Sequence, residues 1–223
     1  MTNKEAVQNL DAVITEIEFS RLQVNNHKIV QLVAISKYSE PDDIQKLYES
    51  GQRAFGENKV QDLKRKQEAL EELPIAWHFV GSLQKNKINN LIDLNPVLMH
   101  SLDSLDLAED LDKKLKAKNK KMNCLLQINS AYEETKSGVS PENAVEIYEE
   151  IQNKYTNINL KGVMSIGAHS EDRDKITQSF KITKKIFDTC KDATICSMGM
   201  SSDFSTAIIN GSTMVRVGST LFK

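Results

Sequence analysis

The chain has 223 residues, and at roughly 150 residues per domain this length allows one large domain or two small ones. Its 29 Lys and Arg residues nearly balance 31 Asp and Glu residues, so the chain lacks the global positive charge that favours nucleic-acid partners. With 39% hydrophobic and 27% charged residues, and apolar runs no longer than a strand, the composition is typical of a globular protein and excludes disordered, collagenous and membrane-spanning classes.

The cysteines and the N-terminal residues indicate in which cellular compartment the protein is located. Cys124, Cys190 and Cys196 are too few for a disulfide framework and do not have the spacing of metal ligands. The first ten residues are polar and contain Glu5, without the apolar core of a signal peptide or the Arg-rich character of a transit peptide. We therefore expect a cytoplasmic protein without a metal site.

The first predicted element is a long amphipathic helix over about 3–25, within an N-terminal segment 1–26. Its apolar residues recur at helical spacing: Val7, Leu10, Val13, Ile14 and Ile17. The apolar run IVQLVAI at 29–35 then predicts a strand buried on both faces. A helix over about 41–50 follows, because Pro41 suits a first helical turn and Gly51 suits a helix end.

The same alternation of strand and helix continues along the chain. Further strands are predicted at 53–55, 77–80, 97–101, 123–128, 162–166, 194–197 and 214–217. Helical patterns lie between them at 57–72, 84–93, 104–119, 141–155, 172–190 and 202–210. Strands separated by helices at every step indicate crossover connections and a parallel sheet.

Eight such units predict an α/β fold, a single TIM-type (β/α)8 barrel over residues 1–223 with an extra N-terminal helix packed on it. An open, doubly wound sheet is the alternative geometry. The chain stops six residues after the last predicted strand, so the N-terminal helix is expected to fill the place of the usual eighth outer helix. No linker or low-complexity segment divides the sequence, which favours one domain.

Lys37 is the first candidate for chemistry, because it follows the first predicted strand in V-A-I-S-K-Y. Residues that follow the strands build the functional face of a barrel. A lysine beside a buried strand is costly as a cation, and this cost favours a neutral, nucleophilic amine suited to forming a Schiff base. The alternative is a side chain that simply reaches solvent past the strand end.

Two loops rich in glycine and serine follow the last two strands. The first, S-M-G-M-S-S-D, places Ser201 and Ser202 at a helix start, and the second, R-V-G-S-T, contains Gly218 and Ser219. Free backbone N–H groups and hydroxyls at these two loops would bind an anion, and barrels commonly bind phosphate there. Ordinary helix capping is the alternative for each loop alone.

Arg216 lies two residues before Gly218 in an otherwise apolar strand. If Val215 and Val217 face the outer helices, the arginine side chain points into the barrel and should face an acceptor. An ion pair with a buried carboxylate is the alternative role. Together with Lys37 and the two loops, Arg216 points to a ligand that carries both a carbonyl and a phosphate.

These residues lie in six blocks, in order, between positions 33 and 219: V-A-I-S-K, F-G-E-N, W-H-F-V-G-S-L-Q-K-N-K, Q-I-N-S with K-S-G, S-M-G-M-S-S-D and G-S-T-M-V-R-V-G. The set resembles the pyridoxal phosphate homeostasis protein family. This resemblance implies a single-domain barrel like the N-terminal domain of bacterial alanine racemase.

The resemblance also implies residue roles around pyridoxal 5′-phosphate. Lys37 matches the Schiff-base lysine, Arg216 the arginine that faces the pyridine nitrogen, and the phosphate neighbours are Ser201, Ser202, Gly218 and Ser219. Asn58 matches an asparagine near the cofactor, while His78 and Lys136 are candidate residues of the barrel mouth. A core histidine and a solvated loop lysine are the alternatives for those two. The chain departs from the family in Ser219, where threonine is commoner, and in its ending L-F-K.

The implied arginine has a chemical consequence. A permanent cation beside the ring nitrogen keeps that nitrogen unprotonated, which weakens the cofactor as an electron sink. Alanine racemase compensates with a tyrosine from a second domain, for which this length leaves no room. We therefore expect no catalytic residues and a monomeric carrier or buffer of pyridoxal phosphate, with apoenzymes as recipients and no nucleic-acid or membrane partner. A low-activity amino-acid racemase and a Schiff-base aldolase acting on a sugar phosphate are the alternatives.

Overall fold

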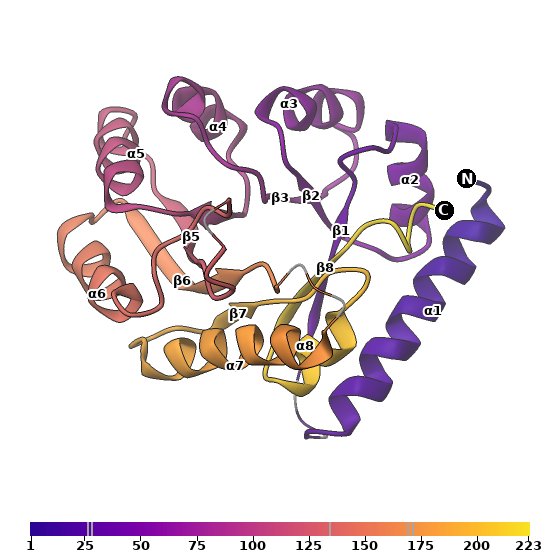
Figure 1. Ribbon diagram of the computed structural model, residues 1–223. Coiled ribbons are helices and arrows are strands. Elements are labelled where there is room, and N and C mark those ends of the chain that lie inside the picture. Colours follow the sequence, from indigo (N-terminus) through magenta and orange to yellow (C-terminus); the bar gives the residue numbers. More distant parts are fainter. Residues whose placement is uncertain (26, 28, 134, 169, 171) are drawn as a thin grey trace.

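In the described part of the chain, eight strands hydrogen-bond in chain order into a closed parallel barrel, with helices outside it (Figure 1). The structure is a computed structural model that describes residues 1–223 except 26, 28, 134, 169 and 171. The pairing of β1 with both β2 and β8 closes the sheet. The predicted TIM-type barrel is therefore confirmed, and the open sheet is excluded.

The strands are β1 (Gln31–Ile35), β2 (Ala54–Glu57), β3 (Ala76–Phe79), β4 (Leu98–Leu102), β5 (Met122–Ile128), β6 (Ile158–Ser165), β7 (Ile195–Ser197) and β8 (Met214–Val217). The helices are α1 (Asn3–Leu22), α2 (Pro41–Glu49), α3 (Val60–Ala69), α4 (Ile88–Leu94), α5 (Leu105–Ala117), α6 (Ala144–Lys154), α7 (Arg173–Thr189) and α8 (Phe204–Ile209), and a 3₁₀ turn, η1 (Lys85–Lys87), precedes α4. Among the described residues, no helix is both long enough and apolar enough to cross a bilayer.

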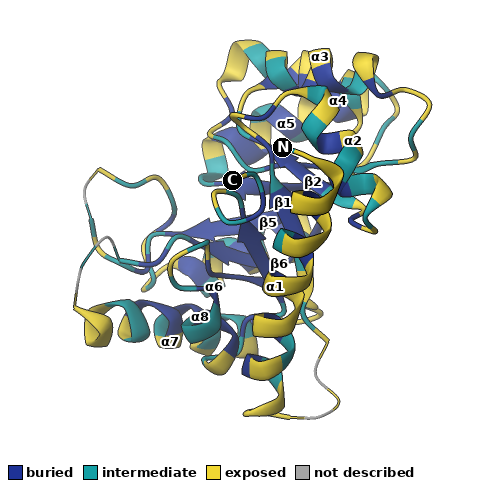
Figure 2. Ribbon diagram, turned by 90° about the vertical axis from the view of Figure 1, so that its right-hand side faces the viewer, coloured by how far each residue is buried: buried dark blue, intermediate teal, exposed yellow. Residues whose placement is uncertain are grey.

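Successive side chains along each strand point to opposite faces of the barrel wall, and this alternation divides the core into two parts. Outward-facing residues pack against the helices in one large cluster that includes Val215 and Val217. A small inner cluster fills the barrel and contains Val33, Leu98, Leu125, Met164 and Met214. Figure 2 shows the strands buried and the outer faces of the helices exposed. The inner cluster forms an apolar floor beneath the C-terminal ends of the strands.

Helix α1 lies against α2 and α8, the outer helices at the two ends of the ring (Figure 1). Thr2 and Glu5 form a capping box at its start. At its other contacts, Asn9 donates to the backbone oxygen of Leu221 and Ser205 donates to Glu16. The amphipathic pattern of α1 thus buries one helix face on the barrel between α2 and α8.

Several predicted boundaries were wrong by a few residues. β1 begins at Gln31 and leaves Ile29 79% exposed. β2 continues to Glu57, which pairs with Phe79, so α3 begins only at Val60. The sequence pattern ended this strand at 55 because Gly and Glu have low strand propensity. β6 also starts earlier than predicted, because its exposed Lys161 interrupts the apolar pattern; the register with β5 shifts at this residue, and the pairing continues on both sides of it.

Candidate functional site

Lys37 lies at the C-terminal mouth of the barrel, two residues beyond Ile35, which packs on the inner cluster. Its side chain is exposed, and its ammonium lies 4.9 Å from the centre of the Tyr38 ring, itself 89% exposed. The expected cost of burying this cation therefore does not arise, and that part of the sequence reasoning was wrong. The amine extends past the strand end, where a ligand in the mouth can reach it.

Arg216 occupies the barrel interior and is only 5% exposed. Its Nη1 donates to the carbonyl oxygen of Ser197 at 2.9 Å and to the Ser197 hydroxyl at 2.7 Å, and Nη2 donates to the carbonyl oxygen of Ser165 at 2.9 Å. Burial lowers the pKa of Arg216 to about 10, against the opposing charge of Asp203. The hydrogen bonds go to carbonyls and a hydroxyl, not to the buried carboxylate of the alternative role.

Three of the five guanidinium N–H groups of Arg216 are thus engaged with described residues. The Nε–H and one N–H of Nη2 remain for another acceptor. Because Arg216 lies level with Val33 of β1 in the sheet register, the guanidinium lies below the level of Lys37. A ligand that enters the mouth between them would meet an amine above and a cation below.

A row of hydrogen bonds links Arg216 to two buried histidines. The Ser197 hydroxyl lies 3.3 Å from Nδ1 of His100, and Nε2 of His100 lies 2.8 Å from Nδ1 of His78. Because Ser197 accepts from Arg216, its own proton goes to His100, and His100 then donates from Nε2 to His78. This direction requires both imidazoles to be neutral.

Burial keeps both histidines in that neutral state. It lowers the pKa of His78 to about 4 and the pKa of His100 well below its usual value, and repulsion from His78 and Arg216 acts on His100 in the same direction. His78 is 6% exposed, and its Nδ1 bonds to the His100 side chain and not to the backbone. Neither ring therefore carries the additional proton that a general acid would transfer at neutral pH.

The loops after β7 and β8 meet, as their place in a barrel predicts. The backbone N–H of Gly218 donates to the Ser201 hydroxyl at 3.1 Å, while the neighbouring Ser202 and Ser219 are exposed. A β-carbon at Gly218 would lie 3.0 Å from the carbonyl oxygen of Ile35, so the second loop also packs closely on the end of β1. The Ser201 hydroxyl is thus bonded to the loop that packs on the strand leading to Lys37.

A pocket of about 570 Å³ opens beside these loops, and Lys136, Ser202 and Asp203 line it. Lys136 is not a free solvated lysine, because its Nζ donates to Glu133 at 2.9 Å and to the carbonyl oxygen of Gly167 at 2.8 Å. Burial raises the pKa of Asp203, opposed by the Met200 N–H and by the charges of Arg216 and Lys136. The pocket therefore places both signs of charge beside the hydroxyl-rich loops.

Asn58 follows β2 on the opposite side of the mouth and is half-buried. The loop after β3 lies directly against it, since a β-carbon at Gly81 would lie 1.9 Å from the carbonyl oxygen of Asn58. Only glycine allows this approach between two backbones. Asn58 is therefore held at a fixed position on the rim.

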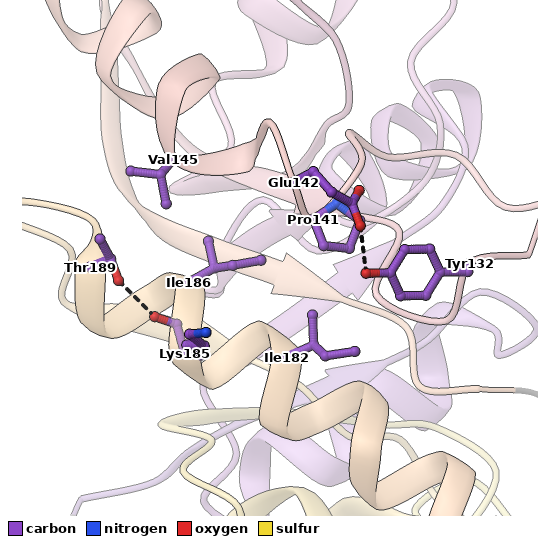
Figure 3. Close-up of a pocket in the computed structure, with 8 residues that line it drawn as sticks. All are labelled: Tyr132, Pro141, Glu142, Val145, Ile182, Lys185, Ile186 and Thr189. Carbon is purple, nitrogen blue, oxygen red and sulfur yellow. Dashed lines mark hydrogen bonds between the residues drawn. The ribbon is translucent and has the colours of Figure 1, made fainter.

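A second hollow, of about 310 Å³, lies on the outside of the barrel between α6 and α7 (Figure 3). Tyr132 donates to Glu142 at 2.7 Å on its rim, and Ile182 and Val145 line its apolar part. None of the predicted site residues lines this hollow. No group of three metal-ligating side chains is found in the described ranges of the chain.

The sequence reasoning missed His100, Ser197 and Asp203. His100 stands two residues after the inner Leu98, and alternation alone would have placed both side chains inside the barrel. Ser197 and Asp203 gave no comparable signal, because a serine at a strand end and an aspartate before a helix are common capping features.

Comparisons with known proteins agree with the barrel fold. Residues 9–223 match the family model described as the alanine racemase N-terminal domain. The pyridoxal phosphate homeostasis protein of Helicobacter pylori is 54% identical over 216 residues, covering 97% of both chains. The human protein of the same name is 36% identical over 207 residues, covering 86% of this chain and 75% of its own. The structure of PipY from Synechococcus elongatus with PLP bound superposes with a TM-score of 0.82 at 29% identity, covering 98% of this chain and 100% of PipY.

Proposed function

This chain belongs to the pyridoxal phosphate homeostasis protein family, and we propose that it binds pyridoxal 5′-phosphate at the barrel mouth through a Schiff base on Lys37. Its role would be that of a carrier or buffer in cytoplasmic cofactor homeostasis. The PLP-bound structure of PipY, which shares the fold over nearly the whole chain, supports the choice of ligand.

The residues present fit this cofactor. Arg216 carries the proposal, because this cation, only 5% exposed, has two N–H donors left for an acceptor inside the barrel, and a pyridine nitrogen is one. Lys37 offers an exposed amine for the aldehyde, and the hydroxyls of Ser201, Ser202 and Ser219 lie at the loops suited to a phosphate. Asn58 and Lys136 lie on the rim, with no role assigned to them.

Attachment needs no co-reactant. The Lys37 amine adds to the aldehyde carbonyl, a C=N bond replaces the C=O bond, and one water leaves.

Bound pyridoxal phosphate normally supplies an electron sink through a protonated ring nitrogen. Arg216 is a donor and a cation, so it holds that nitrogen unprotonated, and the neutral His100 and His78 behind it deliver no proton at neutral pH. This arrangement favours a role in binding and storing the cofactor over a role in catalysing reactions with it.

The partners follow from this role. We propose that the protein acts as a monomer and releases the cofactor to apoenzymes that depend on it. Size-exclusion chromatography with light scattering tests the first statement, and transfer to an apoenzyme separated by a dialysis membrane, compared with transfer in direct mixture, tests the second. Faster transfer in the mixture than across the membrane supports direct handover.

The test of the site is the visible absorption of the purified protein before and after borohydride reduction. We expect a yellow protein whose cofactor becomes irreversibly attached to Lys37, as located by peptide mass spectrometry. Lys37→Ala should lose both the band and the attachment, while Lys59→Ala, which removes an exposed lysine just after Asn58, should keep them. Retention of the band in Lys37→Ala would refute the proposal.

The two alternatives give different outcomes in the same experiments. An aldolase acting on sugar phosphates would be colourless as purified. A racemase would exchange the α-hydrogen of an amino acid for solvent deuterium, and we expect no such exchange above the rate of free cofactor.

A further inference from the structure

A buried ion pair lies outside the barrel wall, apart from the residues assigned to the cofactor. Nζ of Lys66 on α3 is 2.7 Å from Oε1 of Glu57 at the end of β2, and the two side chains are 1% and 0% exposed. Burying two charges is costly, and an apolar pair of similar volume often serves stability as well. The presence of this pair therefore points to a task other than packing.

Both charged groups converge on Ser36, the residue between β1 and Lys37. Lys66 donates to the Ser36 carbonyl oxygen at 2.6 Å, and the Ser36 hydroxyl donates to Oε1 of Glu57 at 2.6 Å. The Ser36 N–H donates to the carbonyl oxygen of Gly56 at 3.0 Å. Every polar group of Ser36 is thus engaged, and we call Ser36, Glu57 and Lys66 the Ser36 brace.

Lys37, the next residue, has a side chain that is far less constrained by contacts than that of Ser36. The Lys37 side chain is exposed, and the face of Tyr38 is the contact that the structure gives its ammonium. The backbone that carries Lys37 therefore starts from a fully bonded, buried residue, while the amine itself is exposed to solvent. Loops at strand ends are ordinarily more mobile than this.

We propose that the Ser36 brace positions Lys37 for attack on the cofactor aldehyde. This inference rests on the proposed function. The phosphate of the ligand would be held by the loops after β7 and β8, so the amine must reach the aldehyde from a separate element, β1. Fixing the start of the Lys37 side chain limits the volume that its amine samples, and a misplacement of about 1 Å can cost about 100-fold in rate.

A second ion pair joins nearly the same two segments and provides the control. Nη1 of Arg65, the residue before Lys66, lies 2.8 Å from Oε2 of Glu40, just before α2, and both side chains are exposed. This pair connects α3 to the chain after Lys37 but does not contact Ser36. Loss of the exposed pair should leave the position of Lys37 unchanged.

The experiment measures how fast added pyridoxal phosphate attaches to Lys37, by borohydride quenching at timed intervals and mass spectrometry. The main variant is Glu57→Leu with Lys66→Met, which removes both buried charges and should still fold. We expect attachment about 10- to 100-fold slower than in the wild type, about tenfold slower in Ser36→Ala, and unchanged in Arg65→Met. Amide hydrogen exchange in a peptide spanning 36–40, measured without cofactor, should be faster in the double variant.

The outcomes separate this inference from the function on which it rests. If Lys37→Ala still traps the cofactor, the proposed function fails and the positioning role fails with it. If Lys37 is the attachment point but the double variant reacts at the wild-type rate, only the positioning role is overturned. Slower attachment without faster exchange at 36–40 overturns it as well, because the loss would then have another cause.

Discussion

The buried histidine pair predicts a specific loss of stability in acid. The pKa of His78 falls from 6.5 to about 4 on burial, so between these pH values the unfolded chain binds a proton that the folded chain does not. The contribution of neutral His78 to the free energy of unfolding is therefore fully present well above pH 6.5 and is lost progressively as the pH falls below it. The linkage relation gives a loss of about 2 kcal/mol by pH 5 and about 3 kcal/mol by pH 4 from this one side chain.

The assay is urea unfolding at a series of pH values from 7.5 to 4.5. The comparison is with His78→Asn, whose amide oxygen can accept the His100 proton in place of Nδ1. Both proteins should carry Lys37→Ala, because bound ligand would add its own pH dependence. We expect the variant to be less stable at pH 7.5 and the difference to shrink by about 2 kcal/mol by pH 5.

A constant difference between the two proteins across this pH range would refute the reasoning. It would mean that His78 titrates alike in the folded and unfolded chains. A His78 imidazole signal that titrates near its ordinary pKa in NMR spectra would lead to the same conclusion.

Three further predictions concern the barrel interior and its rim. Arg216→Lys should lose about 2–3 kcal/mol of unfolding free energy in urea, because one ammonium cannot replace all the charge-assisted hydrogen bonds to buried acceptors. Gly81→Ala should lower the melting temperature through a loss of about 3 kcal/mol or more, because its β-carbon would meet the Asn58 backbone; an unchanged melting temperature would contradict this close approach. Cys124 and Cys190 should resist alkylation at pH 7 until urea unfolds the chain, because burial raises the pKa of both thiols, that of Cys190 to about 11; mass spectrometry of the intact protein measures the labelling.

The interior of the barrel is arranged in layers, and this explains how one fold combines a stable core with a polar site. Leu98 and Met214 belong to the inner apolar cluster, and two residues further along the same strands stand His100 and Arg216. The apolar layer closes the bottom of the barrel, and the polar layer above it faces the mouth. A cation placed directly on apolar packing is costly, and its hydrogen bonds to Ser197 offset part of that cost.

The sequence by itself determined the order and kind of the elements. The apolar run before Lys37 and the recurring helix signals are local features, since side-chain period and capping chemistry depend on neighbours a few residues away. The same locality located the residues that follow the strands, among them Lys37, Ser201 and Gly218. Their meeting at one mouth then followed from the rule that parallel strands point the same way.

Only the tertiary structure decided which side chains pair across the barrel. The row from His78 to Arg216 joins β3, β4, β7 and β8, and the Ser36 brace joins the residue after β1 to β2 and α3. Such pairings depend on the stagger between strands far apart in the chain, which no local pattern encodes. The exposure of Lys37 was decided in the same way, because the depth of a strand end in the barrel is set by its neighbours.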